Sequence, residues 1–478
     1  MTDSAPNSIP DSRGASSASS RVVQSIRLVA GDSSLPLHEQ LYRRIRELIL
    51  SGTLPAGSKL PSSRALAASI GISRNSILTA LERLAADDWI ETRRGSGIYT
   101  AYRGALVQEG SIPASSARRA DIPFAVGLSA VDLFPLKVWQ KLQTRRWSRP
   151  SNGMLQRGDW RGWPDLRIAI AAHVASARGL NCSAEQVIVT TGTRTGLELA
   201  IRALDLSGRE IWMEDPGFHR WPAALRFSGA TLVPVPVDSE GLQVEIGEEL
   251  FPGARAAHVT PACQFPTSVA MSEARRSLLR NWASRTGSWI FEADYGWQSY
   301  AGNRAPLPMA VSEPHRTVYF GSFNHTLFAG LCIAFLIVPL DQIDRFAAID
   351  AGLDGQTCVP NQVILADFMN GGHLDEFFRH FKSAIAERKS ALFAALDQQD
   401  LATLVPHRQD AGLHLVCDLV SRSEDDAIAL CRTNHIAAAA MHQFRDAPTE
   451  RQQLLLGYAT FKTEALTAAA HALGTALR

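Results

Sequence analysis

Residues 60–101 read LPSSRALAASIGISRNSILTALERLAADDWIETRRGSGIYTA, and they carry the clearest structural signals in the first part of the chain. Ser62 and Ser73 each precede a short run with helical periodicity, as N-cap residues do, and Gly71 separates the two runs. In the second run, apolar residues recur at the spacing of one helix face: Ile77, Ala80, Leu81 and Leu84. The stretch therefore predicts two helices joined by a tight turn.

The sequence on either side completes a small domain. Residues 37–50 (LHEQLYRRIRELIL) place apolar side chains at helical spacing, with arginines on the other face. Residues 89–99 alternate in the manner of two short strands with a Gly-rich turn between them. Three helices followed by a hairpin are the outline of a winged helix-turn-helix domain, which is an α+β fold.

The start of the third helix and the hairpin turn carry residues suited to a DNA duplex. In a helix-turn-helix domain, the N-terminal end of the second motif helix enters the major groove, where Arg binds guanine edges. Arginines beside small residues in a turn suit a phosphate backbone or a minor groove. The candidate DNA-binding residues are Ser63, Arg64, Ser73, Arg74, Asn75, Ser76, Arg94, Gly95 and Gly97. Such a unit can also mediate dimerisation, and the spacing alone leaves that alternative open.

Over its whole length and in its order of motifs, this stretch resembles the GntR-type winged-helix domain. The resemblance implies that Arg64 meets the DNA backbone and that Arg74 contacts DNA from the recognition helix. It also implies that the turn from Gly95 to Gly97 forms the tip of the wing. Double-stranded DNA is therefore the expected macromolecular partner.

Composition limits the class of protein. The chain has 478 residues, of which 46% are hydrophobic and 20% charged, values near those of globular proteins with two or three domains. Lys and Arg number 48 against 47 Asp and Glu, so any contact with DNA has to come from a local basic face.

Cysteine use and hydropathy bear on the compartment. The chain has six cysteines and no CxxC pair, which argues against a zinc cluster, any other metal site of that kind and a disulfide framework. No stretch approaches about 20 unbroken apolar residues, and the N-terminal region has no signal-peptide pattern. We therefore expect a cytoplasmic protein with no membrane partner.

Composition also sets domain boundaries. Residues 1–34 are rich in Ser, Ala, Pro, Asp and Gly and are expected to form a disordered arm. The winged-helix unit occupies residues 35–102, and residues 103–122 read as a linker. Residues 123–478 alternate helical stretches with short apolar runs at 186–190, 210–213, 288–291 and 317–320. This alternation predicts an α/β fold around a largely parallel sheet.

Four motifs in the second part follow one another in a recognisable order: WRGWPDLR (160–167), TTGTRTGL (190–197), EDPGF (214–218) and QFPTS (264–268). They resemble landmarks of the type I aminotransferase fold, whose cofactor is pyridoxal phosphate. Together with the first domain, residues 36–475 are similar to the MocR subfamily of GntR regulators. The resemblance implies a phosphate cradle in 190–197, a cofactor pocket and a head-to-tail homodimer.

The chain departs from the pattern of that family at three positions. His325 stands in place of the lysine that forms an imine with pyridoxal phosphate, and an imidazole forms no stable imine. Cys332 stands in place of the phosphate-binding Arg. Ala293 stands in place of the carboxylate that keeps the pyridine nitrogen protonated, although a shift of one residue would give that role to Asp294. No Lys occurs between residues 141 and 382.

The other residues at these positions predict a pocket that lacks the lysine and the phosphate-binding arginine of the family. The candidate pocket residues are Thr193, Arg194, Phe218, Asp294, Tyr295, Ser322 and His325. Pockets at the C-terminal ends of strands usually bind ligands. Core packing for Phe218, helix capping for Thr193 and a satisfied buried position for His325 are open alternatives. Arg194 is a candidate replacement cation for the phosphate, in which case pyridoxal phosphate binds without a covalent bond; the other alternative is that no cofactor binds.

These observations favour a DNA-binding transcription regulator of the MocR/GntR type. Its aminotransferase-like part is expected to dimerise and to sense a small ligand, related to pyridoxal phosphate or to amino acids, without a covalent bond. Because the lysine is missing, no catalytic residue is expected. The alternatives are a pyridoxal-phosphate-dependent aminotransferase with an accessory DNA-binding domain, and a dimerising scaffold that binds DNA constitutively.

Overall fold

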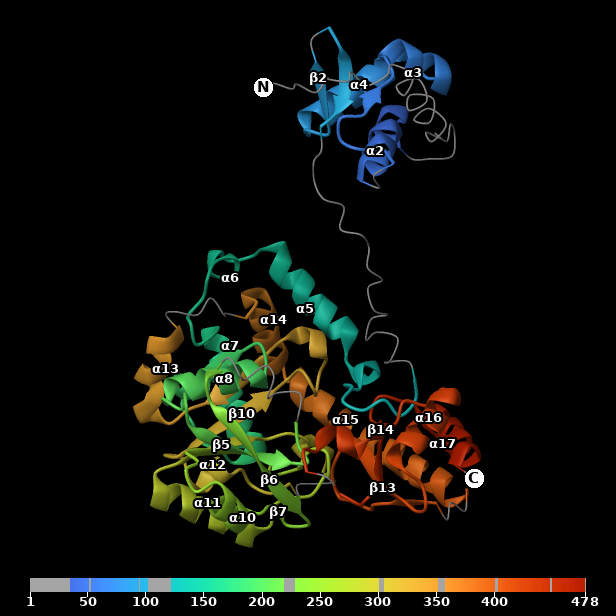
Figure 1. Ribbon diagram of the computed structural model, residues 1–478. Helices are drawn as coiled ribbons and strands as arrows, with labels where there is room; N and C mark the ends of the chain where they lie inside the picture. Colours follow the sequence, from blue (N-terminus) through green and yellow to red (C-terminus); the bar gives the residue numbers. More distant parts are fainter. Residues whose placement is uncertain are drawn as a thin grey trace, which may run out of the picture. The chain divides into compact units, whose positions relative to one another are not determined.

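The computed structural model describes residues 35–50, 53–93, 95–101, 122–218, 228–300, 305–350, 357–399, 403–447 and 449–477. The chain divides into two compact units, residues 1–114 and 115–478 (Figure 1). The expected arm, residues 1–34, lies outside the described residues. So does the expected linker, except for Ile122, and both remain predictions.

The described residues of the first unit form three helices and three short strands: α2 (Leu37–Leu50), β1 (Lys59–Leu60), α3 (Ser63–Ile70), α4 (Arg74–Ala86), β2 (Ile90–Arg93) and β3 (Gly97–Thr100). The strands pair in the order β1-β3-β2, and both pairings are antiparallel. The predicted winged helix-turn-helix is confirmed. Strand β1 was not predicted, because two residues carry too little periodicity to be recognised.

Local capping explains where the motif helices begin and end. The Ser62 hydroxyl accepts a hydrogen bond from the backbone N–H of Ala65 at 3.3 Å, and Ser73 accepts one from Ser76 at 3.1 Å. Gly71 ends α3 at φ +78°, a left-handed conformation that glycine adopts without a steric penalty. The predicted inner face of α4 is buried against α2 and α3.

The Ser73 cap gives the first prediction. Replacing Ser73 by Ala leaves the Ser76 N–H without its side-chain acceptor, so the free energy for opening the start of α4 should fall by about 1 kcal/mol. Amide hydrogen exchange within α4 in the full chain measures this change. Ser69→Ala, on an exposed position inside α3, is the control and should have little effect. Equal protection of α4 in both variants would contradict the prediction.

The second unit is built on a sheet of eight strands: β4 (Val187–Thr190), β5 (Glu210–Asp215), β6 (Thr231–Asp238), β7 (Gly241–Leu242), β8 (Ala256–Val259), β9 (Trp289–Ala293), β10 (Thr317–Ser322) and β11 (Ala334–Ile337). Their order is β4-β11-β10-β9-β8-β5-β6-β7. The five strands from β10 to β6 run parallel, whereas β11 and β7 are antiparallel to their neighbours. The prediction of a largely parallel sheet is confirmed.

Helices cover both faces of this sheet (Figure 1). On one face, α8 (Thr193–Ala203) and α13 (Ile343–Asp350) enclose a core with the strands. On the other face lie α7 (Pro164–Arg178), α10 (Val244–Leu250), α11 (Glu273–Thr286) and α14 (Val359–Asn370). Strands covered on both faces are apolar throughout, which is why they appear in the sequence as continuous apolar runs.

The bounds of four predicted strands differ from the structure. The run 186–190 begins as strand only at Val187, because Gln186 belongs to a short 3-10 helix. The run 288–291 is strand over Trp289–Ala293. The runs 210–213 and 317–320 each extend by two residues, to Asp215 and Ser322. In the last three, pairing with neighbouring strands continues beyond the local apolar run.

The C-terminal part adds a smaller sheet that the sequence did not predict. Strands β12 (Leu404–Pro406), β13 (His414–Leu419), β15 (Gln453–Gly457) and β14 (Ala439–Ala440) pair antiparallel in that order. Helices α15 (His373–Asp397), α16 (Glu424–Thr433) and α17 (Thr463–Leu477) pack beside it, at the orange and red end of Figure 1. None of the helices in the described part of the chain is both long enough and apolar enough to cross a bilayer.

Candidate ligand cavity and DNA-contacting residues

A cavity of about 120 Å³ lies beyond the carboxyl ends of β9 and β10. Residues after these two strands line it, together with the segment after β8, α15, and the start of β13 in the small sheet. Five of the seven predicted pocket residues line it: Phe218, Asp294, Tyr295, Ser322 and His325. Thr193 and Arg194 do not. Arg194 is exposed at the start of α8, away from the lining.

Aromatic rings form much of the cavity wall. Phe218 stacks on Phe265 with ring centroids 4.5 Å apart and meets Tyr295 edge to face at 5.9 Å. Tyr295 in turn meets the His325 imidazole edge to face at 5.4 Å. Such contacts fix ring orientations, so the wall is pre-formed. His325 is exposed, so the alternative of a satisfied buried histidine is wrong. The protein atoms packed around its ring still lower its pKa by desolvation, and the ring is neutral at pH 7.

The end of β9 settles which carboxylate faces the cavity. Side chains alternate along a strand, so Ala293 and Asp294 point to opposite faces of the sheet. Ala293 is buried in the core beneath α8, whereas Asp294 lines the cavity. Its Oδ2 accepts hydrogen bonds from Arg178 Nε at 2.6 Å and from the Tyr319 hydroxyl at 2.7 Å. Asp294 therefore stands at the cavity, but its carboxylate is already hydrogen-bonded to Arg178 and Tyr319.

Arg178 is the residue that sequence reasoning missed most clearly. Its Nη2 donates to Asp294 Oδ1 at 3.0 Å and to the Pro306 carbonyl at 2.7 Å, and its guanidinium lies 5.1 Å from the centre of the Trp297 ring. Burial acts to lower its pKa, and Asp294 outweighs that effect, so the pKa is raised. In the sequence, Arg178 stands just before a helix-ending glycine, where a positive charge is explained by its favourable interaction with the helix dipole. Nothing in that pattern indicates a place at the cavity.

The turn before α8 has its hydroxyl groups occupied by the chain itself. Tyr295 donates a hydrogen bond to Thr193 Oγ1, and the hydroxyls of Thr191 and Thr195 lie 2.9 Å apart. Asn324 Nδ2 donates to the Thr191 carbonyl at 3.0 Å. The cavity lining includes none of residues 190–197. Thr193 therefore holds the cavity wall in place from outside.

The lysines and arginines of the described residues lie outside the cavity lining. Lys389 on α15 donates to the Gln409 carbonyl, and burial lowers its pKa. Cys332, in a left-handed turn after β10, is exposed. Within the described residues, no three or more His, Cys, Asp or Glu side chains are grouped so that they could hold a metal ion.

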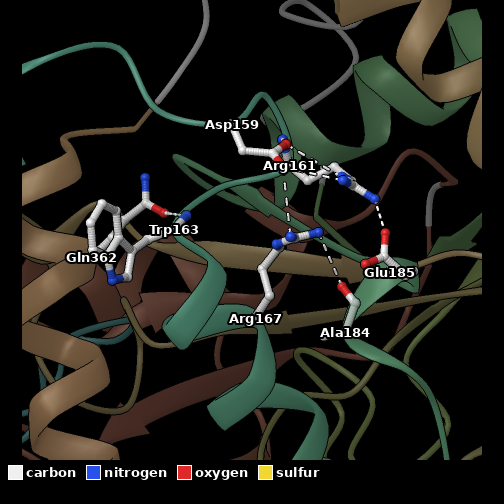
Figure 2. A network of polar contacts seen from close by, with 7 residues as sticks. All are labelled: Asp159, Arg161, Trp163, Arg167, Ala184, Glu185 and Gln362. Atoms are coloured by element: carbon white, nitrogen blue, oxygen red, sulfur yellow. Dashed lines mark hydrogen bonds and ion pairs between the residues drawn. The ribbon is translucent and has the colours of Figure 1, made fainter. Parts of the chain in front are cut away.

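The 160–167 motif has a structural role at the entry to α7. Arg161 lies between two carboxylates, Asp159 at 3.1 Å and Glu185 (Figure 2). The Trp163 backbone N–H donates to Gln362 Oε1 on α14 at 2.7 Å. These contacts fix the start of α7, and the same helix ends in Arg178 at the cavity.

In the first unit, the structure places most candidate DNA-binding residues on exposed helix starts. Arg64 in the first turn of α3 and Arg74 and Asn75 in the first turn of α4 are exposed. Ser63 and Ser76 are half-buried, and Ser73 acts as the cap of α4. This arrangement leaves the two arginines free to meet an approaching duplex.

The hairpin turn is built on glycines, as the sequence indicated. Gly95 and Gly97 have φ values of +75° and +119°. Arg94 lies outside the described residues. Sequence reasoning missed Lys59 on β1, whose ammonium lies 5.8 Å from the centre of the Tyr99 ring, while Arg93 lies 4.5 Å from it. Lys59 is far from the hairpin turn in the sequence, so only the pairing of β1 with β3 shows that it lies beside the wing.

Comparisons with known proteins agree with this two-part organisation. The family model for bacterial regulatory proteins of the gntR family matches residues 37–100, and that for aminotransferase class I and II matches residues 122–250. The "Probable rhizopine catabolism regulatory protein MocR" of Rhizobium meliloti is 33% identical over 453 residues, covering 90% of this chain and 91% of the relative. The chain belongs to the MocR family of transcription regulators.

Other relatives of this MocR-type chain include the "HTH-type pyridoxine biosynthesis transcriptional regulator PdxR" of Corynebacterium glutamicum. It is 30% identical, over 79% of this chain and 83% of the relative. Among solved structures, the alpha-aminoadipate aminotransferase LysN of Thermus thermophilus has a TM-score of 0.67 at 24% identity, covering 77% of this chain and 95% of LysN. That likeness confirms the predicted aminotransferase-like fold of the MocR-type second unit.

Proposed function

We propose that this transcription regulator acts as a cytoplasmic homodimer whose second unit senses a small ligand without a covalent bond. The observation that carries the proposal is a pre-formed aromatic cavity in which His325 stands where the resemblance places the lysine. A cavity at the carboxyl ends of parallel strands is a common ligand site. An imidazole in that place removes covalent attachment and leaves the capacity to bind.

The same cavity argues against catalysis. An aminotransferase needs an amine that attacks the cofactor aldehyde and then moves protons. The described lining residues include no Lys. Lys389 on α15 is half-buried, and its ammonium donates a hydrogen bond to the Gln409 carbonyl. We therefore infer that the chain is not an enzyme, and the accessory-domain aminotransferase is the weaker alternative.

The residues present do not fit pyridoxal phosphate as a tightly held cofactor. A phosphate dianion in such a fold needs a cation and free donors near a helix N-terminus. In the described residues, Arg194 and Cys332 are exposed and lie outside the lining. The side-chain hydroxyls of the 190–197 turn are hydrogen-bonded within the chain. Asp294, the candidate partner of the pyridine nitrogen, is paired with Arg178.

Exposed apolar side chains support the homodimer part of the proposal. Leu136 and Trp147 on α5 (Leu136–Ser148), with Ile168 on α7, have exposed fractions of 67%, 51% and 58%. Apolar surface of this kind is common where a second chain packs. Two DNA-binding units related by a twofold axis would read a palindromic or repeated site.

DNA binding by α4 gives the second prediction. Replacing Arg74 by Ala should weaken binding to the operator by about 1–3 kcal/mol, because a base-contacting Arg is lost from the recognition helix. Replacing Arg64 by Ala should weaken binding to all sequences alike and reduce its dependence on salt, because a phosphate contact is lost. A gel-shift titration with the region upstream of the chain's own gene measures both effects.

The matched control is Arg209→Ala, which removes an exposed arginine from the second unit. It should leave the titration unchanged. Unaltered operator binding by Arg74→Ala would contradict the role given to α4. Indifference of the unchanged chain to a specific competitor would contradict the proposed function itself.

A further inference from the structure

We infer that the cavity binds an uncharged molecule with a single aromatic ring, and excludes phosphorylated or carboxylated relatives of that molecule. The inference rests on the proposed function of the second unit as a ligand sensor, and it specifies the ligand class. It differs from what the LysN structure, which shares the fold, holds, namely N-(5'-phosphopyridoxyl)-L-leucine.

Charge balance is the first argument. Among the described lining residues, Asp294 is the only one with a permanent charge, and Arg178 neutralises it from behind the cavity surface. His325 and His414 also line the cavity, and desolvation lowers the pKa of each, so both rings are neutral at pH 7. An anion that entered would lose its hydration without gaining a cation, which is costly.

The shape and composition of the wall are the second argument. Four aromatic side chains line the cavity: Phe218, Phe265, Tyr295 and Phe381. They offer ring faces and edges to a planar ligand. The volume of about 120 Å³ is close to that of an apolar cavity of roughly 150 Å³ that holds a single benzene ring. A single ring of that size therefore fits the cavity.

The unused hydrogen-bonding groups are the third argument. Within the residues that the structure describes, neither the His325 imidazole nor the Gln298 amide has a hydrogen-bond partner, although both line the cavity. By contrast, His414 Nε2 lies 2.6 Å from the Pro266 carbonyl, and Gln264 donates to the carbonyl of Pro216. His325 and Gln298 therefore suit a neutral hydroxyl or amide on the ligand ring.

The test uses two matched pairs of probes with the purified full-length chain. Phenyl phosphate is phenol with a phosphate group added, and benzoate has a carboxylate in place of the hydroxymethyl group of benzyl alcohol. Isothermal titration should show binding of phenol and benzyl alcohol, with affinities about tenfold or more above those of their anionic partners. Pyridoxal should likewise bind more tightly than pyridoxal phosphate.

Variants locate the binding. Leu128 lines the cavity, and Leu128→Trp should fill it and remove phenol binding. Leu340→Trp, the same change at a position that is 64% exposed, is the control and should bind phenol normally. Gln298→Lys places a cation among the lining residues and should raise the affinity for phenyl phosphate. This gain does not depend on whether the Trp variant folds.

Three results would overturn the inference: no binding of either neutral probe, equal binding of phenyl phosphate by the unchanged chain, or phenol binding that survives in a folded Leu128→Trp. A gel-shift titration on the same samples separates this inference from the proposed function. If the operator is bound but the neutral probes are not, only the ligand class is wrong. If the operator is not bound, the regulator proposal fails.

Discussion

Replacing Arg178 by Met is expected to lower the free energy of unfolding of the second unit by about 3–5 kcal/mol. The Arg178 and Asp294 side chains are 3% and 1% exposed, and two hydrogen bonds join them. Removing the guanidinium leaves a buried carboxylate whose remaining side-chain donor is the Tyr319 hydroxyl. The cost is therefore that of an uncompensated charge, which is larger than the value of the ion pair itself.

Urea unfolding of the full chain measures this change. Arg285→Met is the matched control, because Arg285 pairs with Glu248 at the surface, where the side chains are 64% and 36% exposed. The control should change the stability by less than about 1 kcal/mol. Adding Asp294→Asn to Arg178→Met should restore part of the loss, because the unpaired charge is then gone. Similar free energies of unfolding for the Arg178 and Arg285 variants would contradict the importance given to the buried pair of Arg178 and Asp294.

The second large effect is a gain of imine formation with pyridoxal phosphate. A chain carrying both His325→Lys and Cys332→Arg is expected to develop a visible imine absorbance with pyridoxal phosphate, which borohydride fixes onto residue 325. The first change supplies the amine, and the second restores a cation at the position that the resemblance gives to the phosphate-binding Arg, whose long side chain extends beyond the reach of Cys332. His325→Lys alone should react with pyridoxal, which has no phosphate. The unchanged chain should give no such adduct at the cavity.

His315→Lys combined with Cys332→Arg is the control, since His315 is an exposed histidine away from the cavity. It accounts for imines that any surface lysine forms. Peptide mapping after borohydride identifies the modified residue. A stoichiometric adduct of the unchanged chain at Lys389 would revive the aminotransferase alternative, because it would show that a second amine reaches the cavity.

The sequence predicted the first unit well because its signals are local. Ser62, Gly71 and Ser73 act on backbone groups within four residues of themselves, so the caps could be read directly. The main sheet was predicted from apolar runs, but its strand ends were not. Glu214 extends β5 although it is acidic, because Thr260 donates to it in the interior and burial raises its pKa to about 7.

The cavity was predicted only in part, because a cavity joins residues distant in the chain. Phe218, Tyr295 and His325 were found through motifs that resemble a known family. Arg178 lies at the far end of the helix that the 160–167 motif begins, and His414 lies in a sheet that no motif marks, so only the folded chain brings them to the site. The role of Asp294 was left open in the sequence, and strand alternation decided which way its side chain points.

The cavity draws its wall from two sheets that share no strand pairing: Asp294 and Ser322 come from the ends of the main sheet, and His414 from β13 of the small one. A molecule bound there would contact both sheets at once. Its binding would therefore add contacts between the two sheets without changing the hydrogen bonds within either of them.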